Sequence, residues 1–507
     1  MLLHDVVAAS AAVRATQSRK AKTAVLAECL TRAAESDDLA VVVRWLGGSL
    51  RQRRTGVGWR SLSALPEPAD SPTLEVAEVD GLFEEMSTLS GPGSQGRRAE
   101  AVTALFSRAT SEEQPWLRGL ITGEVRQGAA DALVLEAVAH ATQVPLAVVR
   151  RGAMLAGSTV EPAVAAFAGG EGAVAAIGLE VGRPVLPMLA SSAPDLSAAL
   201  AKAGADEQPV AIDTKLDGIR IQVHRDGDDV LVVTRSLDDI TARLPEVVAL
   251  ARALPAQRFV LDGEALAFTD DGRPRPFQET ASRTAQSDGV AVTPYFFDLL
   301  HLDGRDLLDE PGEARLDALT RLVPEHALIH RVVTDDPAVA EAFSREVLAL
   351  GHEGVVVKNL LAPYAAGRRG AAWVKVKPEH TLDLVVLAVE WGSGRRRGWL
   401  SNIHLGARDP DSPTGFTMLG KTFKGMTDAM LAWQTERFLA LETHREGHIV
   451  HVRPEQVVEI AFDGLQRSSR YPGGVALRFA RVLRYREDKA ASDADTIEHV
   501  RSLDFGA

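Results

Sequence analysis

The sequence predicts a multi-domain protein with an all-α N-terminal domain, a central α+β domain with antiparallel sheets, and a C-terminal β-barrel. Three observations indicate this fold class. The chain has 507 residues, which at roughly 100–200 residues per domain corresponds to about three domains. The apolar pattern changes from helical to strand-like near residue 185, and the charge balance changes near residue 380. We therefore expect domains at 1–185, 186–380 and 381–507.

The first domain is predicted to be helical. The segments KTAVLAECLTRAAE and AADALVLEAVAHATQV have apolar residues at spacings of three and four, which is typical of amphipathic helices. The Gly- and Pro-bearing segments LPEPADSP and LSGPGSQGRR separate such stretches and indicate loops. A helical domain is the simplest interpretation.

The second domain contains short β-branched runs with Asp-Gly turns between them, such as those in PVAIDTKLDGIRIQVHRDGDDVLVVTRS. Asp226-Gly227 lies between two alternating runs, which predicts a β-hairpin. Similar runs follow in RFVLDGEALAF, PYFFDLLHLDG and EGVVVKN. Helical patterns intervene at about 245–253 and 336–350. Together these features predict a mixed α+β domain with antiparallel sheets.

The third domain holds strand-like segments such as TLDLVVLAVEW and HIVHVRPEQVVEIAFDG. It has 17 Lys and Arg residues and 17 Asp and Glu residues, so its net charge is zero, whereas the whole chain has a net charge of −13. Many short strands in a small domain indicate a β-barrel.

Composition excludes several classes of protein. Hydrophobic residues make up 46% and charged residues 25% of the chain, which excludes global disorder. A single cysteine, Cys29, excludes an intramolecular disulfide or a Cys-rich zinc site and fits a reducing compartment. Neither a membrane-spanning run nor a secretory signal is recognisable, so we expect a cytoplasmic protein. The charge of −13 argues against a protein that coats nucleic acid, unless its basic residues gather on an inner face.

The sequence lacks the usual P-loop, H-E-x-x-H and G-x-S-x-G signatures. The segment DTKLDGIR, residues 213–220, is a different candidate for nucleotide chemistry. On an extended backbone Asp213, Lys215 and Asp217 would share one face. Two interpretations stay open for this segment by itself: a surface ladder of ion pairs, or a reactive lysine between two carboxylates.

Further motifs follow in order: LDGE at 261–264, FFD at 296–298, EGVVVK at 353–358 and WVKVK at 373–377. In the last of these, Val374 and Val376 are predicted to face a core, which leaves Lys375 and Lys377 together on the opposite face. Two such lysines repel each other unless an anion lies between them or water screens them. A solvated edge strand is the alternative.

This ordered set of motifs closely resembles the nucleotidyltransferase motifs of ATP-dependent DNA ligases, of the bacterial three-domain (ligase B) type. KLDGIR resembles motif I, and TRS at 234–236 resembles its neighbour. LDGEALAF, FFDLLHLDG, EGVVVK and WVKVK resemble motifs III, IIIa, IV and V, and RFARVLRYREDK at 478–489 resembles motif VI. LITGEVRQGAADALVLEAVAHA, followed by PVLPMLA, resembles the N-terminal DNA-binding domain and its exit linker. The resemblance covers almost the whole chain.

The resemblance implies that Lys215 takes AMP from ATP and passes it to the 5′-phosphate of a nick, after which the 3′-hydroxyl displaces AMP. An attacking lysine must be neutral, although its reference pKa is about 10.4. Burial and nearby cations lower that value, and Arg220, Lys375 and Lys377 are the candidate cations.

The resemblance also implies roles for further residues and a C-terminal domain with an OB-fold. ATP would contact Asp213, Arg220, Arg235, Glu264, Phe297, Arg369, Lys375 and Lys377. Phe297 would stack on adenine, and Asp213 stands where many relatives have Glu, which leaves base selectivity open. Glu264 and Glu353 would hold Mg²⁺, with Mn²⁺ as an alternative. Arg486, Asp488 and Lys489 would orient pyrophosphate when the C-terminal domain closes over ATP.

Nicked double-stranded DNA is the implied partner, bound by a monomer that closes around the duplex. The implied DNA contacts are Arg97, Arg98, Arg118, Arg126, Ser236, Arg395, Arg396 and Arg397. Backbone contacts of this kind carry no sequence code. The implied location is the bacterial cytoplasm, on the nucleoid when DNA is bound. Alternatives are an RNA ligase, a GTP-using capping-type nucleotidyltransferase, or a non-catalytic DNA-binding scaffold.

Overall fold

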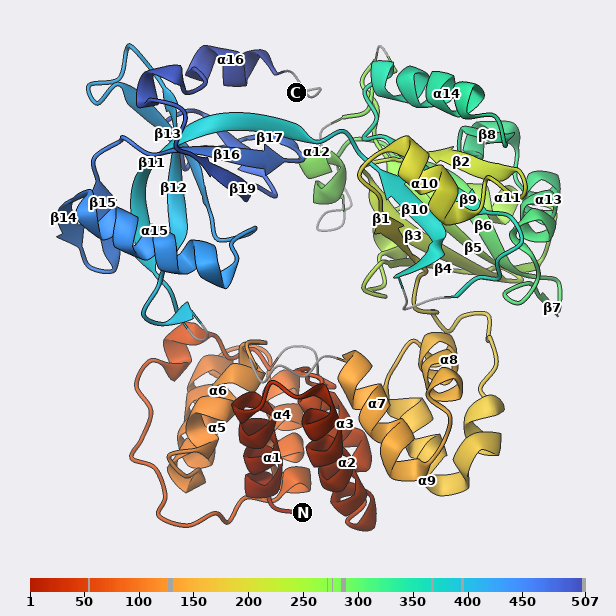
Figure 1. Cartoon of the computed structure of the whole chain (residues 1–507). Helices are drawn as coiled ribbons and strands as arrows, with labels where there is room; N and C mark the ends of the chain where they lie inside the picture. The colour runs from red at the N-terminus through yellow and green to blue at the C-terminus, as the bar shows by residue number, and fades with distance from the viewer. Residues whose placement is uncertain are drawn as a thin grey trace.

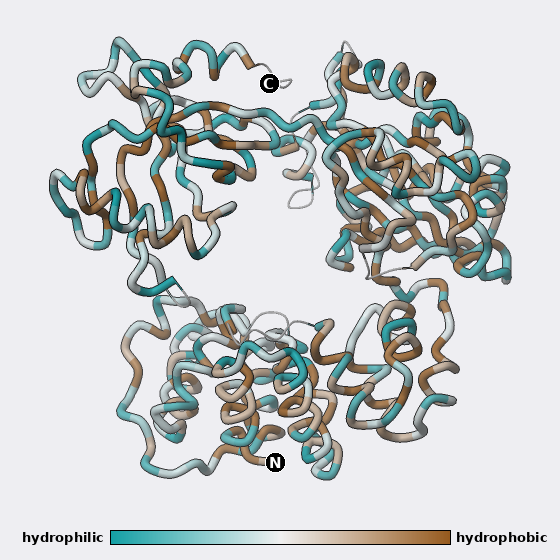
Figure 2. The backbone as a smooth tube through the Cα atoms, viewed as in Figure 1, coloured by the Kyte–Doolittle hydropathy of each residue, from teal (hydrophilic) through white to brown (hydrophobic). Residues whose placement is uncertain are grey.

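The computed structural model describes residues 1–52, 55–125, 131–270, 272–275, 277–283, 289–365, 369–393 and 396–503. It has a helical N-terminal domain, a central domain with two sheets and a C-terminal domain with one large sheet, arranged as a ring (Figure 1). Figure 2 shows apolar stretches along the strands of both β-containing domains. No helix in the described part of the chain is long and apolar enough to cross a membrane.

The N-terminal domain is helical because each segment presents a stripe of apolar residues to a common core. In α3 the buried residues include Leu39, Val42, Val43 and Leu46, which recur at the helical period. The Trp45 ring of this helix meets Phe83 and Trp116 edge-on, at 6.1 and 5.9 Å between ring centroids, which ties three helices together. The described helices are α1 (Leu3–Ala15), α2 (Arg19–Glu35), α3 (Leu39–Leu46), η1 (Trp59–Leu62), α4 (Val76–Thr88), α5 (Ser94–Arg108), α6 (Glu113–Ile121), α7 (Asp131–Thr142), α8 (Leu146–Ala156) and α9 (Val160–Ala175).

The central domain is built on two five-stranded sheets. The order of the first sheet is β1-β10-β9-β2-β8 and that of the second is β4-β3-β5-β6-β7. The strands are β1 (Leu189–Ser192), β2 (Val210–Thr214), β3 (Ile219–Asp226), β4 (Asp229–Thr234), β5 (Arg258–Leu266), β6 (Thr293–Leu302), β7 (Arg305–Asp306), β8 (Arg331–Thr334), β9 (Val355–Asn359) and β10 (Arg369–Val376). The pairings are antiparallel as predicted, except that β1 pairs with β10 in parallel.

Helices accompany both sheets of the central domain. They are α10 (Leu196–Ala203), η2 (Thr241–Arg243), α11 (Pro245–Ala253), α12 (Phe277–Ser282), α13 (Gly312–Leu322), η3 (Glu325–Ala327) and α14 (Pro337–Ala349). Residues of α10 and α14 share an apolar core with the first sheet, and those of α11 and α13 share one with the second. The predicted helices at about 245–253 and 336–350 are confirmed as α11 and α14. The predicted hairpin at Asp226-Gly227 is confirmed between β3 and β4.

The C-terminal domain is an antiparallel sheet of the kind seen in OB-folds. Its elements are β11 (His380–Trp391), β12 (Leu400–Arg408), β13 (Phe416–Thr422), α15 (Asp428–Ala440), β14 (Glu442–Glu446), β15 (Ile449–Val452), β16 (Val457–Phe462), β17 (Gly464–Arg467), β18 (Val475–Arg478), β19 (Arg481–Arg486), η5 (Ala491–Asp493) and α16 (Ile497–Ser502). The long strand β11 pairs with β16 through its first half and with β15 through its second. The described strands do not close into a continuous barrel, and β17 and β18 form a separate two-stranded ribbon.

Candidate active site

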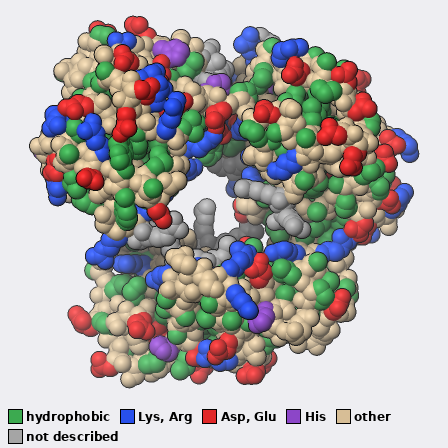
Figure 3. Space-filling model, in the orientation of Figure 1, with side chains coloured by type: hydrophobic (Ala, Val, Ile, Leu, Met, Phe, Trp, Pro, Cys, Tyr) green, Lys and Arg blue, Asp and Glu red, His purple; other side chains and the backbone are tan. Residues whose placement is uncertain are grey.

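A large cavity opens where the three domains meet, toward the hollow centre of the ring (Figure 3). Its volume is about 2060 Å³, and residues of all three domains line it. The basic residues of the lining are Lys215, Arg220, Arg235, Arg243, Lys358, Lys375, Lys377, Lys424, Arg478 and Arg481. The acidic ones are Asp213, Asp217, Asp238, Asp239, Glu264, Glu353, Glu379 and Asp463. The described residues of the cavity lining therefore have a formal charge of +2, whereas the whole chain has −13.

Lys215 lies at the cavity directly after the end of β2. Its backbone N–H donates to the Gly354 carbonyl at 2.8 Å, and its carbonyl accepts from Glu353 at 3.2 Å. Its ammonium group forms an ion pair with Glu353, whose other oxygen lies 2.6 Å from Lys377 Nζ. The two lysines hold the pKa of Glu353 below its usual range although burial opposes this. Glu353 thus lies between the two lysine side chains and binds both.

The paired lysines of WVKVK lie as predicted. Val374 is fully buried in the core and Val376 packs against that core, while Lys375 and Lys377 both line the cavity. The anion next to Lys377 is the carboxylate of Glu353, 2.6 Å from its Nζ. Asp463 of the C-terminal domain lies 3.4 Å from the same nitrogen. Burial by itself would lower the pKa of Lys377, but the negative charge of Glu353 outweighs this effect and raises that pKa.

The prediction that one extended strand carries Asp213, Lys215 and Asp217 is wrong in its geometry. β2 ends at Thr214, because the chain then crosses from the first sheet to β3 of the second. All three residues still line the cavity, but each has a different partner. Asp213 binds Arg331 and Lys358, and Asp217 binds Arg478 of the C-terminal domain at 2.7 Å.

Glu264 projects from β5 toward the cavity beside Lys215 and Arg220. Burial raises the pKa of its carboxyl group to about 7, even though the positive charges of Arg220 and Lys215 oppose the shift. Arg220 is bound by both oxygens of Asp262, at 2.7 and 2.6 Å. Asp262 also accepts from the hydroxyl of Tyr364 at 2.7 Å. The charge of Arg220 is therefore largely compensated by Asp262.

Phe297 and Trp373 line the cavity next to each other. The two rings meet edge-on with centroids 5.9 Å apart. Lys358 Nζ lies 4.4 Å from the Phe297 centroid and 4.1 Å from the Trp373 centroid, within the range of cation–π contacts. This part of the cavity lining combines aromatic surface with the charged groups of Lys358 and Asp213.

The two predicted metal ligands, Glu264 and Glu353, both line the cavity near Lys215. Across the described residues, no group of three or more His, Cys, Asp or Glu side chains could hold a metal ion. Mg²⁺ often binds through one or two carboxylates and completes its shell with phosphate oxygens and water. The residues fit a metal ion that binds together with a phosphate-bearing substrate.

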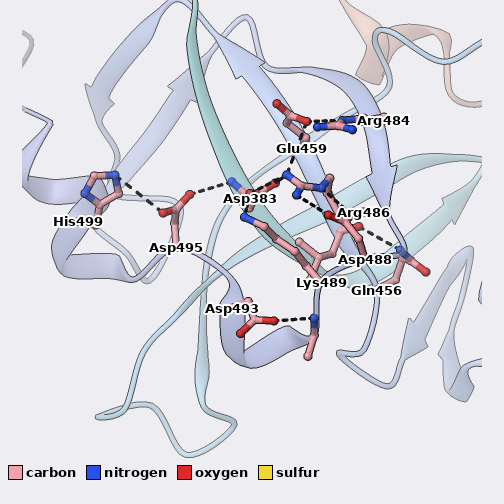
Figure 4. A network of polar contacts seen from close by, with 12 residues as sticks. Asp383, Gln456, Glu459, Arg484, Arg486, Asp488, Lys489, Asp493, Asp495 and His499 are labelled. Carbon is pink, nitrogen blue, oxygen red and sulfur yellow. Dashed lines mark hydrogen bonds and ion pairs between the residues drawn. The ribbon is translucent and has the colours of Figure 1, made fainter.

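The predicted pyrophosphate-orienting residues do not line the cavity. Arg486 binds both oxygens of Asp488, at 2.8 and 2.6 Å, and lies 3.2 Å from Asp383 (Figure 4). Lys489 binds the same Asp383 at 2.5 Å. Other C-terminal residues do reach the central domain, among them Arg478 and Arg481, which pair with Asp217 and Glu379.

The predicted DNA contacts occupy several environments. Arg235 and Ser236 line the cavity, and Ser236 donates to Asp238 at 2.6 Å. Arg98 donates to the carbonyl oxygens of Met86 and Leu89 at the end of α4, and Arg97 is exposed nearby. Arg118 lies 5.9 Å from the ring centroid of Trp59, which is exposed. In the C-terminal domain, Arg396 donates to the carbonyl of Phe423, and Arg397 is exposed. Arg126, Arg395 and the Arg369 side chain lie outside the described residues.

Sequence reasoning missed Arg331, Asp463 and Asp383 as partners of predicted site residues. Arg331 and Asp463 lie outside the recognised motifs, so no local signal marks them. Lys358 belongs to the motif EGVVVK and lies 2.7 Å from Asp213. The N-terminal cavity residues Ser49 and Leu50 also lie outside the recognised motifs, whereas Ile121 belongs to the segment LITGEVRQ.

Comparisons with known proteins agree with this geometry. Residues 187–377 match the family model "ATP dependent DNA ligase domain", 396–489 match "ATP dependent DNA ligase C terminal region" and 60–139 match "DNA ligase N terminus". A protein from a Nocardioides species named "Probable DNA ligase" is 69% identical over 99% of both chains. One of the same name from Kineococcus radiotolerans is 65% identical, over 99% of this chain and 100% of that protein.

A solved structure named "Pmar-Lig_PreS3" has the same overall fold. Its TM-score is 0.62 at 18% sequence identity, over 95% of this chain and 99% of that one. Family models matched in all three domains, together with relatives of high identity over the full length, show that the chain belongs to the family of ATP-dependent DNA ligases.

Proposed function

We propose that the protein seals 5′-phosphate/3′-hydroxyl nicks in duplex DNA with ATP, through a covalent AMP on Lys215. The observation that carries this proposal is the position of the Lys215 amine in a cavity beside Glu353, Lys377 and Glu264. Family membership and the names of the relatives support the same reaction.

The reaction has three displacements at phosphorus. Lys215 Nζ bonds to the α-phosphorus of ATP, and the bond to pyrophosphate breaks. An oxygen of the 5′-phosphate at the nick then attacks the adenylyl phosphorus and releases Lys215. Finally the 3′-hydroxyl oxygen attacks the 5′-phosphorus, which forms the phosphodiester and releases AMP. Such transfers depend chiefly on alignment and on neutralisation of phosphate charge.

The residues around Lys215 suit these demands. Glu353 binds the Lys215 amine and also binds Lys377, which brings a second cation close to the reacting group. Lys375 and Lys377 line the cavity where phosphate charge would develop. Mg²⁺, or alternatively Mn²⁺, would supply further charge neutralisation there, held by Glu264 and Glu353.

Nicked duplex DNA is the proposed partner, bound by a monomer in the hollow of the ring. The cavity lining has a charge of +2 although the chain has −13, which supports an inner surface suited to phosphate backbones. A DNA substrate also supports the expected location in the cytoplasm, on the nucleoid when bound.

The test is a labelling experiment with ATP labelled at the α-phosphate. We expect the unaltered protein to become labelled and Lys215→Ala to take up no label. The exposed residue Lys202 of α10 offers a matched control, and Lys202→Ala should be labelled normally. Full labelling of Lys215→Ala would overturn the assignment of Lys215.

The substrate is tested with ATP, NAD and GTP in parallel on nicked DNA, and with nicked DNA and nicked RNA in competition. Sealing of nicked DNA with ATP alone is the expected result. Preference for nicked RNA would favour an RNA ligase, use of GTP would favour a capping-type enzyme, and no labelling at all would favour a non-catalytic scaffold.

A further inference from the structure

Arg331 is the first residue of β8 and binds Asp213 of the cavity lining. It stands opposite Asp213 in the antiparallel pairing of β8 with β2. The side chain is only 11% exposed. Asp213 and Phe297 are among the described residues that line the cavity, whereas Arg331 is not. Any effect of Arg331 on a bound molecule must therefore pass through its neighbours.

The Arg331 guanidinium joins two groups that belong to different sheets. It binds both oxygens of Asp213, the second at 2.7 Å from Nη2. The same Nη2 donates to the main-chain carbonyl of Phe297 at 3.2 Å. Asp213 is in β2 of the first sheet and Phe297 in β6 of the second. One rigid fork of donors thus links the carboxylate to the backbone that carries the aromatic ring.

Asp213 remains ionised despite its burial. Its side chain is 4% exposed, and burial by itself would raise its pKa. The charges of Arg331 and Lys358 outweigh burial and lower the pKa of Asp213. An ionised carboxylate can only accept hydrogen bonds, so the orientation of its remaining lone pairs decides which donor it can bind at the cavity.

We infer that Arg331 is a positioning residue that sets which nucleobase the cavity accepts, through Asp213 and Phe297. This inference rests on the proposed use of ATP. A base with a 6-amino group offers a donor to the fixed carboxylate, whereas a base with a 6-keto oxygen places an acceptor against it. Arg331 also holds the Phe297 backbone, so the same guanidinium controls the distance between carboxylate and aromatic ring.

The experiment measures kcat and KM for lysyl-nucleotide formation with α-labelled ATP and with inosine triphosphate, which has a keto oxygen in place of the 6-amino group. In Arg331→Met we expect the KM for ATP to rise by roughly tenfold or more. The reason is that the buried Asp213 carboxylate, no longer held by Arg331, would bind the base less selectively. The preference for ATP over inosine triphosphate in kcat/KM should fall by about the same factor. Arg331→Lys keeps the positive charge but not the planar set of guanidinium donors, so it should restore only part of the preference for ATP over inosine triphosphate.

Arg345→Met provides a matched control, since Arg345 is a 75% exposed arginine of α14 in the same domain. Thermal unfolding of each variant identifies a loss of folding. If Arg331→Met does not fold, Arg331→Lys tests the inference instead. The inference is overturned if the variants slow both nucleotides equally, or if the unaltered protein does not distinguish them. Absence of labelling of the unaltered protein would instead overturn the proposed function.

Discussion

The carboxyl group of Glu264 shows how burial competes with neighbouring charge in the cavity. Two cations stand near it, yet its pKa rises to about 7 because burial dominates. One reason is that Arg220 is already bound by both oxygens of Asp262. A carboxyl group with such a pKa is partly protonated at neutral pH, so its charge responds to whatever binds beside it.

Replacing Glu264 with Gln should change how stability depends on pH. The pKa of Glu264 is about 7 in the folded protein, against an ordinary value of 4.5 for a glutamate side chain. Between these values the folded state binds more protons than the unfolded state, so this group's contribution to stability falls as pH rises. Relative to the unaltered protein, Glu264→Gln should gain about 1–3 kcal/mol in the free energy of unfolding between about pH 5 and pH 8.

Chemical denaturation at a series of pH values measures this difference. Glu341→Gln, which changes a 69% exposed glutamate of α14, should show no such trend. A difference between Glu264→Gln and the unaltered protein that stays constant across the series would contradict the raised pKa.

At the scale of elements, the start of β9 is positioned by Gly354. Its φ of +138° is one that residues with side chains rarely adopt, and a Cβ there would collide with the carbonyl oxygen of Val376 in β10. The Gly354 carbonyl accepts from Lys215, and the preceding Glu353 binds both Lys215 and Lys377. The glycine of EGVVVK therefore lets the two strands approach closely enough to bring these three charged groups together.

Gly354→Ala should destabilise the protein by about 2–3 kcal/mol, because both backbone strain and a steric collision result. It should also slow labelling of Lys215 by roughly tenfold, because a shift of the reacting groups by about 1 Å is costly. Gly227 is a suitable control, since its φ is +62° but a Cβ there would meet open space. Gly227→Ala should cost only about 1 kcal/mol and leave labelling unchanged. Equal effects of the two substitutions would refute the close-approach argument.

At the scale of the whole molecule, ion pairs connect the C-terminal domain to the central one. Arg478 binds Asp217 at 2.7 Å, Asp463 lies 3.4 Å from Lys377, and Arg481 binds Glu379. The pairs Asp217–Arg478 and Lys377–Asp463 involve residues that line the cavity. Residues that join these two domains thus also contribute to the charge of the cavity.

Binding of nicked DNA should weaken steeply with salt, because cations of the inner surface replace counterions of the phosphate backbone. For six or more phosphate contacts we expect a loss in affinity of about a thousandfold between roughly 50 and 200 mM monovalent salt. Lys215→Ala allows binding to be measured without turnover. A change of less than about threefold over this range would contradict a clamp that relies on backbone contacts.

Local sequence patterns were sufficient for much of the fold. The helix α11, the turn at Asp226-Gly227 and the shared face of Lys375 and Lys377 agree with the structure. Each depends on periodicity or turn chemistry within a few residues, which the order of amino acids specifies directly. The motif order also identified the family.

The sequence by itself therefore determined the family and the succession of a helical, a mixed and a strand-rich part, and it named Glu264, Glu353 and Lys377 as candidates beside Lys215. Only the tertiary structure decided how those residues are paired. Arg331 is 118 residues from Asp213, and Arg486 is 103 residues from Asp383. Such pairs depend on how sheets pack and where strands end, as at Thr214, where the chain leaves one sheet for the other. No local pattern encodes these contacts, because the free energy that selects them comes from burial and charge compensation across the folded chain.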